Sequence, residues 1–137
     1  MHRRINNLFL LLVIVQALHS LEEYLGHLWE VFPPARIICA MVSPDAEKGF
    51  LVINTGLFLA GVLYYFLVLR NQLEWGYSLI WLWIFIELIN GIGHPVWSLI
   101  EGDYTPGVAT APLLLVLAIL LSGALRKWLE AKAAGHG

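Results

Sequence analysis

Polar side chains recur at helical spacing inside an otherwise apolar stretch near the N-terminus of the chain. His19 precedes Glu22 by three residues and Glu23 by four, so a helix would place the imidazole and a carboxylate on one face. Groups so arranged can share a proton or ligate one metal ion. The polar residues of this stretch fall within a sector of roughly 140° when they are wound at ~100° per residue. They are Gln16, His19, Glu22, Glu23, His27 and Glu30.

A second polar group lies in a later apolar stretch. Glu87, Asn90 and His94 are spaced by three and four residues, which places them within a sector of about 60° on a helix. At 1.5 Å per residue, Glu22 is expected ~25 Å from the start of its helix. The second group is expected ~17–27 Å from the start of its own helix. Because the first and third helices of a four-pass bundle start on the same side of the membrane, these depths coincide, and the two groups are predicted to form one site.

Carboxylates inside a membrane need a partner, since each charged side chain costs at least ~2.5–3.5 kcal/mol near the bilayer centre. Glu22, Glu23 and Glu87 would also repel one another, so they must be protonated or surround a cation. Histidine and carboxylate ligands suit a divalent metal such as zinc or iron. If all three carboxylates point inward, two divalent ions and one hydroxide would cancel the charge. The predicted metal ligands are His19, Glu22, Glu23, Glu87 and His94.

The same residues have a second interpretation, namely a buried polar network that shares protons and holds no metal. In the catalytic interpretation, the residues assigned to catalysis are Glu22, Glu23 and Asn90: Glu23 ligates the metal, Glu22 acts as a ligand or as a general base, and Asn90 orients a ligand. Asn90 alone would also suit a hydrogen bond between two membrane helices. A haem held by the two histidines would leave the carboxylates without a purpose.

Four further polar residues are expected either at the depth of this site or at the membrane interface. Asn54 and Thr110 are expected at the same depth, Asn54 either orienting a ligand or joining two helices. His27 and Glu30 are expected at the membrane interface, near the end of the first helix.

The composition predicts an all-α, polytopic membrane protein. The 137 residues are 59% hydrophobic and only 13% charged, and a soluble fold of this length has too little interior for so much apolar surface. A helix crosses the bilayer with about 20 apolar residues. Residues 1–137 are therefore predicted to form one domain, a bundle of four transmembrane helices. Their expected bounds are about 5–28, 50–69, 76–100 and 106–125.

Prolines and basic residues suggest how these helices are connected and oriented. Pro33-Pro34 is expected to stop the first helix, Ser43-Pro44-Asp45 to start the second and Pro106 to open the last. Only Arg36 and Lys48 fall on one side of a four-pass topology. The positive-inside rule then places both termini in the cytoplasm, in a plasma or inner membrane. The basic residues on the side of the termini are Arg3, Arg4, Arg70, Arg126, Lys127 and Lys132.

Two function classes find no support in the composition. The net charge is -2 and the basic residues form no long run, so no nucleic-acid partner is expected. The single cysteine, Cys39, excludes a disulfide within the chain and a metal site built from cysteines.

The motifs resemble those of the HXXEE-motif family of integral membrane proteins. His19-Ser20-Leu21-Glu22-Glu23 matches the signature, and Asn90-Gly91-Ile92-Gly93-His94 matches a second motif, Asn-x-x-x-His. Tyr104-Thr105-Pro106-Gly107, leading to Thr110-Ala111, is similar to the start of the family's last helix. The resemblance implies a membrane protein that is suspected of enzyme activity because of its polar motifs, without a known reaction. It marks His19, Glu22, Glu23, Asn90 and His94 as motif residues.

We therefore expect a metal-dependent membrane enzyme that acts on a lipid or another hydrophobic small molecule. Zinc in this site would suit a hydrolase, and iron an oxidase. The alternative is a protein that binds or transports a cation, a proton or a small molecule with the same acidic cluster. The sequence does not predict the oligomeric state.

Overall fold

The computed structural model describes residues 2–135, and this part of the chain is helical without strands. The apolar helices α1, α4 (continued by η1), α5 and α6 are each long enough to cross a membrane. This confirms the predicted all-α architecture with four long apolar helices. The elements are α1 His2–Leu25, α2 Leu28–Val31, α3 Pro33–Val42, α4 Ala46–Tyr64, the π-helical turn η1 Tyr65–Leu69, α5 Glu74–Glu101 and α6 Ala111–Ala134.

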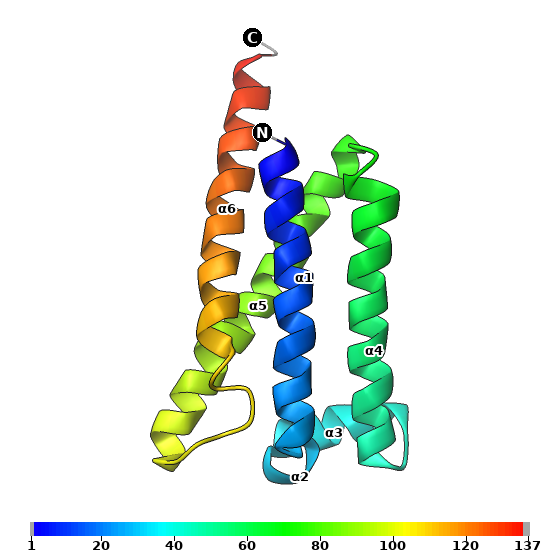
Figure 1. The fold of residues 1–137 in the computed structure, drawn as a ribbon, viewed down its shortest axis with the longest axis vertical. Coiled ribbons are helices and arrows are strands. Elements are labelled where there is room, and N and C mark those ends of the chain that lie inside the picture. Colours follow the sequence, from blue (N-terminus) through cyan, green and yellow to red (C-terminus); the bar gives the residue numbers. More distant parts are fainter. Residues whose placement is uncertain (1, 136–137) are drawn as a thin grey trace.

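The long helices form a bundle in which α1 lies between α6 and α4 in the view of Figure 1, and α5 crosses behind at an incline. The short helices α2 and α3 lie at the lower end and connect α1 to α4. The N-terminal end of α1 and the C-terminal end of α6 lie at the upper end, together with the turn between η1 and α5. Residues 102–110 connect α5 to α6 at the lower end, which we call the loop end.

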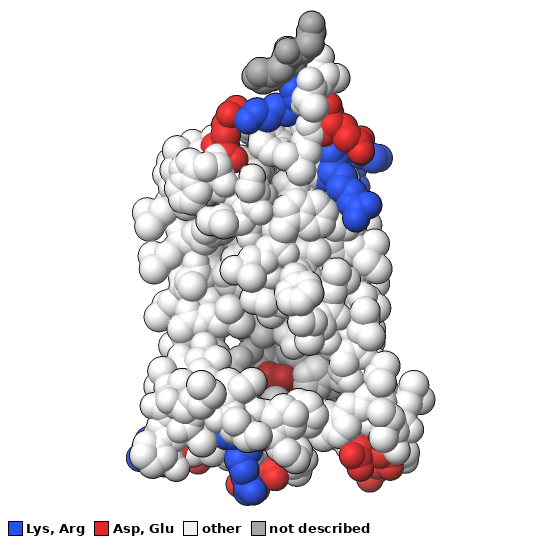
Figure 2. Space-filling view, turned by 180° about the vertical axis from the view of Figure 1, so that it is seen from behind, with Lys and Arg blue, Asp and Glu red and all other residues white. Residues whose placement is uncertain are grey.

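The surface between the two ends is apolar. Figure 2 shows Lys, Arg, Asp and Glu gathered at the two ends of the molecule, with an uncharged belt between them. Large apolar side chains on this surface are exposed, among them Leu63 and Leu82 at 55% and 61%. An exposed apolar surface of this extent is stable against lipid chains and costly in water. The belt therefore fits the hydrocarbon core of a bilayer.

The core of the bundle is packed between α1, α5 and α6. Phe9 of α1 lies edge-to-face against Trp83 of α5, with ring centroids 5.5 Å apart. Gly91 of α5 lies so close to α6 that an added Cβ would come within 2.9 Å of the Leu115 backbone. Close backbone approach at a small residue is a common way for membrane helices to pack, and it fixes the position of α5 against α6.

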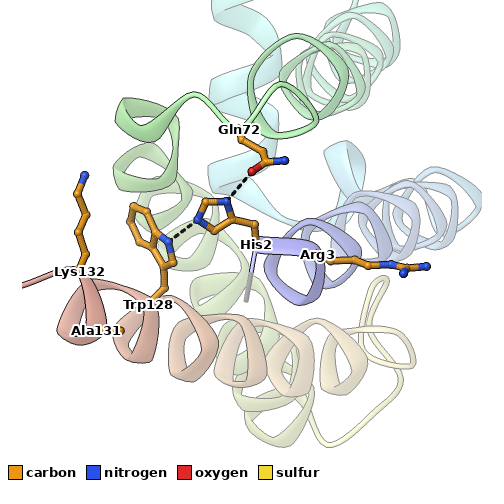
Figure 3. A pocket seen from close by; sticks show the side chains of 6 residues that line it. All are labelled: His2, Arg3, Gln72, Trp128, Ala131 and Lys132. Atoms are coloured by element: carbon orange, nitrogen blue, oxygen red, sulfur yellow. Dashed lines mark hydrogen bonds between the residues drawn. The ribbon is translucent and has the colours of Figure 1, made fainter. Parts of the chain in front are cut away.

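At the end that carries the termini, His2 connects three parts of the chain. As Figure 3 shows, its ring lies between Gln72 and Trp128. Trp128 Nε1 donates to His2 Nε2 at 2.6 Å, so Nδ1 of the same ring carries the hydrogen and donates to Gln72 Oε1 at 3.1 Å. Lys132 of α6 contacts Glu74 of α5 at 2.6 Å. These contacts hold α1, α6 and the start of α5 together.

The fourth helix differs most from its predicted bounds of 106–125. It begins at Ala111, because the backbone amides of Ala109 and Thr110 donate to Glu22 of α1, and Pro106 lies in the loop. It continues to Ala134, since Arg126 and Lys127 mark the edge of the apolar belt and not the end of the helix. Polarity predicts where a helix leaves the membrane, whereas hydrogen bonding decides where it ends.

The first two helices also shift by a few residues. The predicted helix over 5–28 ends at Leu25, because His27 adopts a left-handed backbone conformation with φ of 51°. The Pro33-Pro34 pair, expected to stop that helix, instead begins α3. The predicted helix over 50–69 begins earlier, at Ala46, where Asp45 caps it by accepting from the Lys48 amide at 3.2 Å. The predicted helix over 76–100 extends over Glu74–Glu101.

A pair of glycine substitutions tests the packing of α5 on α6. Gly91→Ala should lower the stability by about 1–3 kcal/mol, because the new methyl group overlaps the α6 backbone. Gly93→Ala should not lower it, since a Cβ at Gly93 has no atom within 4 Å and alanine favours helix. Thermal unfolding of both variants in the same detergent measures the difference. Equal loss of stability in both would contradict the close packing at Gly91.

Candidate metal centre

Three side chains capable of binding a metal ion meet between α1 and α5. One ligand atom from each of His19, Glu23 and His94 lies within 4.8 Å of the others. Glu23 Oε1 lies 3.4 Å from Nε2 of His19 and 3.1 Å from Nε2 of His94. His19 is fully buried, and Glu23 and His94 are 7% and 8% exposed. Two imidazoles and one carboxylate in this arrangement form a ligand set used by both zinc and iron.

The orientation of the His19 ring is fixed by a chain of hydrogen bonds through Thr110. The Thr110 hydroxyl donates to Glu22 Oε2 at 2.6 Å and lies 2.8 Å from His19 Nδ1. Because a hydroxyl has one hydrogen, and that hydrogen goes to the carboxylate, Thr110 accepts the hydrogen of His19 Nδ1. The lone pair of His19 is then on Nε2, which faces Glu23 and has no hydrogen-bond partner among the described residues.

Glu22 holds the loop between α5 and α6 against α1. Besides the Thr110 hydroxyl, its carboxylate accepts the backbone amides of Ala109 and Thr110, both at 2.9 Å, and the Tyr104 hydroxyl at 2.7 Å. Partial burial, together with the bond to Glu22, raises the pKa of the Tyr104 hydroxyl to about 12. Tyr104 therefore keeps the proton that it donates to Glu22 at neutral pH.

The loop packs directly onto the two imidazoles at Gly107. Its backbone has φ of 93°, a conformation that glycine adopts without steric cost. A Cβ at this position would come within 2.6 Å of His94 Nδ1 and 2.8 Å of His19 Cε1. A residue with a side chain would therefore displace either the loop or the rings. Gly26 plays a similar part, since a Cβ there would lie 2.6 Å from Pro106.

A second buried carboxylate, Glu87, lies in its own network of amides and is fully buried. Asn90 Nδ2 donates to Glu87 Oε2 at 3.4 Å. The Gln16 amide, turned so that its nitrogen faces the carboxylate, donates to the same oxygen at 2.7 Å. Ser20, on the same face of α1 as Gln16, donates to Asn54 Oδ1 of α4 at 2.7 Å. The network joins α1, α4 and α5 beside the candidate centre.

The structure divides the predicted ligand set of five residues. It brings His19, Glu23 and His94 together as a group with ligand geometry. Glu22 turns to the loop, and Glu87 turns to the amides of Gln16 and Asn90. The side chains of Glu22 and Glu23 are adjacent in sequence but take different partners, because neighbouring helical positions point in directions about 100° apart.

The remaining polar residues of the sequence pattern fall into two places. Asn54 is half-buried and bonds to Ser20, which joins α4 to α1. His27 and Glu30 lie exposed at the loop end, with Nδ1 of His27 3.9 Å from Oε1 of Glu30. Thr110, expected only to share the depth of the site, contacts both His19 and Glu22.

A small cavity adjoins the candidate centre on the side of α5. It has a volume of about 130 Å³, is lined mainly by apolar side chains and includes His94, Asn90 and Gly93. Ile89 lines it as well and is 55% exposed on the apolar surface, so the cavity reaches the side of the bundle. Figure 2 shows a hollow in the lower half of the uncharged belt with an acidic side chain visible inside it. The polar interior is thus reached from the apolar face.

Sequence reasoning missed the part that the loop plays. Tyr104, the Ala109 amide and Gly107 were not predicted as site residues, yet they hold Glu22 or contact both imidazoles. The signal was present in the glycine of Tyr104-Thr105-Pro106-Gly107, a residue type favoured where the chain must pass close to other groups. The helical spacing of polar residues could not reveal the role of the loop, because residues in a loop do not follow a helical period.

Removing the Glu22 carboxylate tests its role as the anchor of the loop. In Glu22→Ala, four donors lose their acceptor, so backbone amides of residues 105–110 should exchange with deuterium about ten-fold faster or more. Hydrogen–deuterium exchange followed by mass spectrometry measures this. Glu30→Ala, which removes an exposed carboxylate at the same end, should leave the loop unchanged. Equal protection of the loop in both variants would show that Glu22 does not hold it.

The candidate centre is built from residues of the two motifs on which the sequence resemblance rests, His19 and Glu23 from the first and His94 from the second. Comparison with curated proteins and with solved structures found no match. A family model described as "Protein of unknown function with HXXEE motif" matches residues 10–121, which include both motifs and the loop that covers them. This chain therefore belongs to the family of proteins of unknown function with the HXXEE motif.

Proposed function

We propose that this protein is a metal-dependent enzyme of the membrane, which acts on a lipid or another hydrophobic molecule. In this proposal it crosses the bilayer four times with both termini in the cytoplasm. His19, Glu23 and His94 hold one divalent ion, zinc or iron. The observation that carries the proposal is the meeting of these three ligand atoms within 4.8 Å, inside the apolar part of the bundle.

The distances from Glu23 to the two imidazoles fit direct metal ligation. Bonds of about 2.0–2.1 Å to a tetrahedral ion separate neighbouring ligand atoms by about 3.3 Å. The two distances from Glu23 Oε1 to the imidazole nitrogens are 3.1 and 3.4 Å. The lone pair of His19 Nε2 already points to this space, because Thr110 takes the hydrogen on Nδ1. Partners that fix the other ring nitrogen are common for histidines that ligate metals.

The charges favour one ion over two. Glu23 is the carboxylate within the ligand group, and Glu22 is one hydroxyl away through Thr110. Together they carry two negative charges, which one divalent ion balances. A second ion would need further carboxylates, but Glu87 is bound by Gln16 and Asn90 outside the group. Without a metal ion, Glu23 would need a proton of its own or on one of the two histidines to avoid an unpaired buried charge.

The chemistry of the proposed centre comes from the ion and from the residues around it. Bound zinc or iron would supply the Lewis-acid or redox chemistry that the side chains lack. Glu22 and Thr110 hold His19 in one orientation, and Gly107 covers the imidazoles from the loop side. Asn90 lines the apolar cavity beside His94, and in this proposal its amide orients a substrate group. The cavity reaches the apolar face, which favours a substrate that arrives from lipid.

Metal content is the direct test of this proposal. The full chain, purified in detergent, should contain about one zinc or iron ion per molecule, and His19→Ala and His94→Ala should lose it. Elemental analysis by mass spectrometry measures the ion, and circular dichroism verifies that the variants remain helical. His27→Asn, which removes an exposed histidine at a left-handed position that asparagine tolerates, should keep the metal. A folded, metal-free wild type would contradict the proposal.

A milder substitution separates ligand orientation from loss of the ligand. Thr110→Val removes the hydroxyl that holds His19 but keeps all three proposed ligands, so the metal should bind about 10–100-fold more weakly. Competition with a chelator of known affinity measures the change. Thr55→Val, at an exposed position of α4, serves as the matched control. Unchanged affinity in Thr110→Val would mean that the hydroxyl does not position a metal ligand.

A further inference from the structure

Four side chains inside the bundle form a chain of contacts in which the hydrogen atoms can be assigned. The chain runs from Glu87 of α5 through Gln16 and Ser20 of α1 to Asn54 of α4. Glu87 is fully buried, and Gln16 is 5% exposed. A hydroxyl has one hydrogen, and an amide side chain carries hydrogens on its nitrogen alone. The assignment can therefore start at one end of the chain and proceed to the other.

The assignment starts at Asn54, whose amide is oriented by its own helix. Its Nδ2 donates to the Phe50 carbonyl at 3.1 Å, so its Oδ1 is the atom that faces Ser20. Because an amide oxygen can only accept, Ser20 donates its single hydrogen to Asn54, at 2.7 Å. Toward Gln16, at 3.3 Å, the Ser20 hydroxyl then offers only a lone pair.

Gln16 meets that lone pair with its nitrogen, and this places its oxygen against Glu87. In this orientation Gln16 Nε2 donates to Ser20 Oγ, and Gln16 Oε1 lies 2.7 Å from Glu87 Oε2. Two oxygens so close need a hydrogen between them, since about 2.7–2.8 Å is the usual length of an O–H···O bond. The amide oxygen carries no hydrogen. The hydrogen therefore belongs to Glu87, as a carboxylic acid.

An ionised Glu87 would disturb the rest of the chain. The carboxylate needs the Gln16 nitrogen, as described above, and the Gln16 oxygen then faces Ser20. The one hydrogen of Ser20 cannot serve both Gln16 and Asn54, so one pair of oxygens is left without a hydrogen between them. Because a buried polar group without a partner is costly, the chain favours the protonated form of Glu87.

The charges around Glu87 favour the same form. Within residues 2–135, no ion pair joins it to a cation within 4.0 Å. The Asn90 amide lies 3.4 Å away, which is long for a hydrogen bond to a charged oxygen. Residues 50–63 of α4 and 111–125 of α6 contain no titratable side chain. The titratable side chains nearest to it on α1 and α5 are His19, Glu23 and His94. Of these, Glu23 repels a negative charge on Glu87.

We propose that Glu87 is a proton-binding site, which carries one proton, donates it to Gln16 and so keeps Ser20 bonded to Asn54. Release of the proton to water turns the Gln16 amide and draws the Ser20 hydrogen away from Asn54, which weakens the contact between α1 and α4. Among the four long helices, α4 buries the smallest share of its residues, so it depends strongly on such a contact. The site is separate from the proposed metal centre.

Infrared spectroscopy of the full chain tests the protonation, because a carboxylic acid and a carboxylate absorb in separate regions. A maltoside detergent is suitable, since it has no carbonyl group of its own. At neutral pH the difference between wild type and Glu87→Gln should contain the band of one carboxylic acid. Glutamine also offers a donor toward Gln16, so the variant should stay folded, as circular dichroism verifies.

The control for this experiment is Glu30→Gln, at an exposed position, which should remove carboxylate absorption instead. Loss of carboxylate absorption in Glu87→Gln would overturn the proposal.

Ser20→Ala tests the link between Glu87 and α4. Without the hydroxyl, Gln16 no longer has to present its nitrogen to position 20, so an ionised Glu87 becomes less costly. Half of the acid band should disappear at a pH about one unit lower than in the wild type, or lower still. Ser78→Ala, at an exposed position of α5, should titrate like the wild type. Equal titration in Ser20→Ala and wild type would overturn the link through Ser20.

Metal content, measured on the same samples, separates this proposal from the proposed function. Glu87→Gln should contain as much metal as the wild type, because the three proposed ligands are unchanged. The acid band of Glu87 in a wild type without metal would refute the enzyme but not the proton site. Loss of metal in Glu87→Gln would place Glu87 among the ligands and overturn the proton site.

Discussion

The hydroxyl of Thr110 lies between a carboxylate that can only accept and an imidazole nitrogen 2.8 Å away. Its single hydrogen goes to Glu22, so its lone pair must receive the hydrogen of His19. That assignment leaves Nε2 of His19, the nitrogen that faces Glu23, without a hydrogen. It also ties α1, the loop and the start of α6 to one another. Because each member of this chain of hydrogen bonds fixes the next, it leaves few alternative arrangements of Glu22, Thr110 and His19.

The helical architecture could be predicted from the sequence because its cause is local. About twenty apolar residues in a row have few stable solutions other than a helix in lipid, and four such runs give four helices. The ends of the helices were harder to predict. Ala111 begins α6 because distant residues bind the preceding amides, and no local pattern contains that information. Likewise, His27 ends α1 through a backbone conformation that histidine adopts only occasionally.

The sequence predicted which residues form the candidate site, but not which groups each of them contacts. Helical spacing places His19 beside Glu23, and the Asn-x-x-x-His motif supplies His94 on a second helix. Spacing did not distinguish Glu22 from Glu23, since both lie within reach of His19 on an ideal helix. In the structure, Glu22 accepts a hydrogen bond from the loop at Thr110, whereas Glu23 lies beside His94 of α5. Such a division depends on the packing of helices, which a single helical wheel does not describe.

The contact between His19 and Thr110 joins residues 91 positions apart in the chain. If the helices enter the membrane in the order of synthesis, His19 and Glu23 arrive long before the loop and α6 have left the ribosome. During that interval the polar face of α1 has no Thr110 to orient its imidazole and no Gly107 to cover it. A nascent chain that stopped after α5 would leave these groups uncovered. Completion of the candidate site thus coincides with the addition of the last helix.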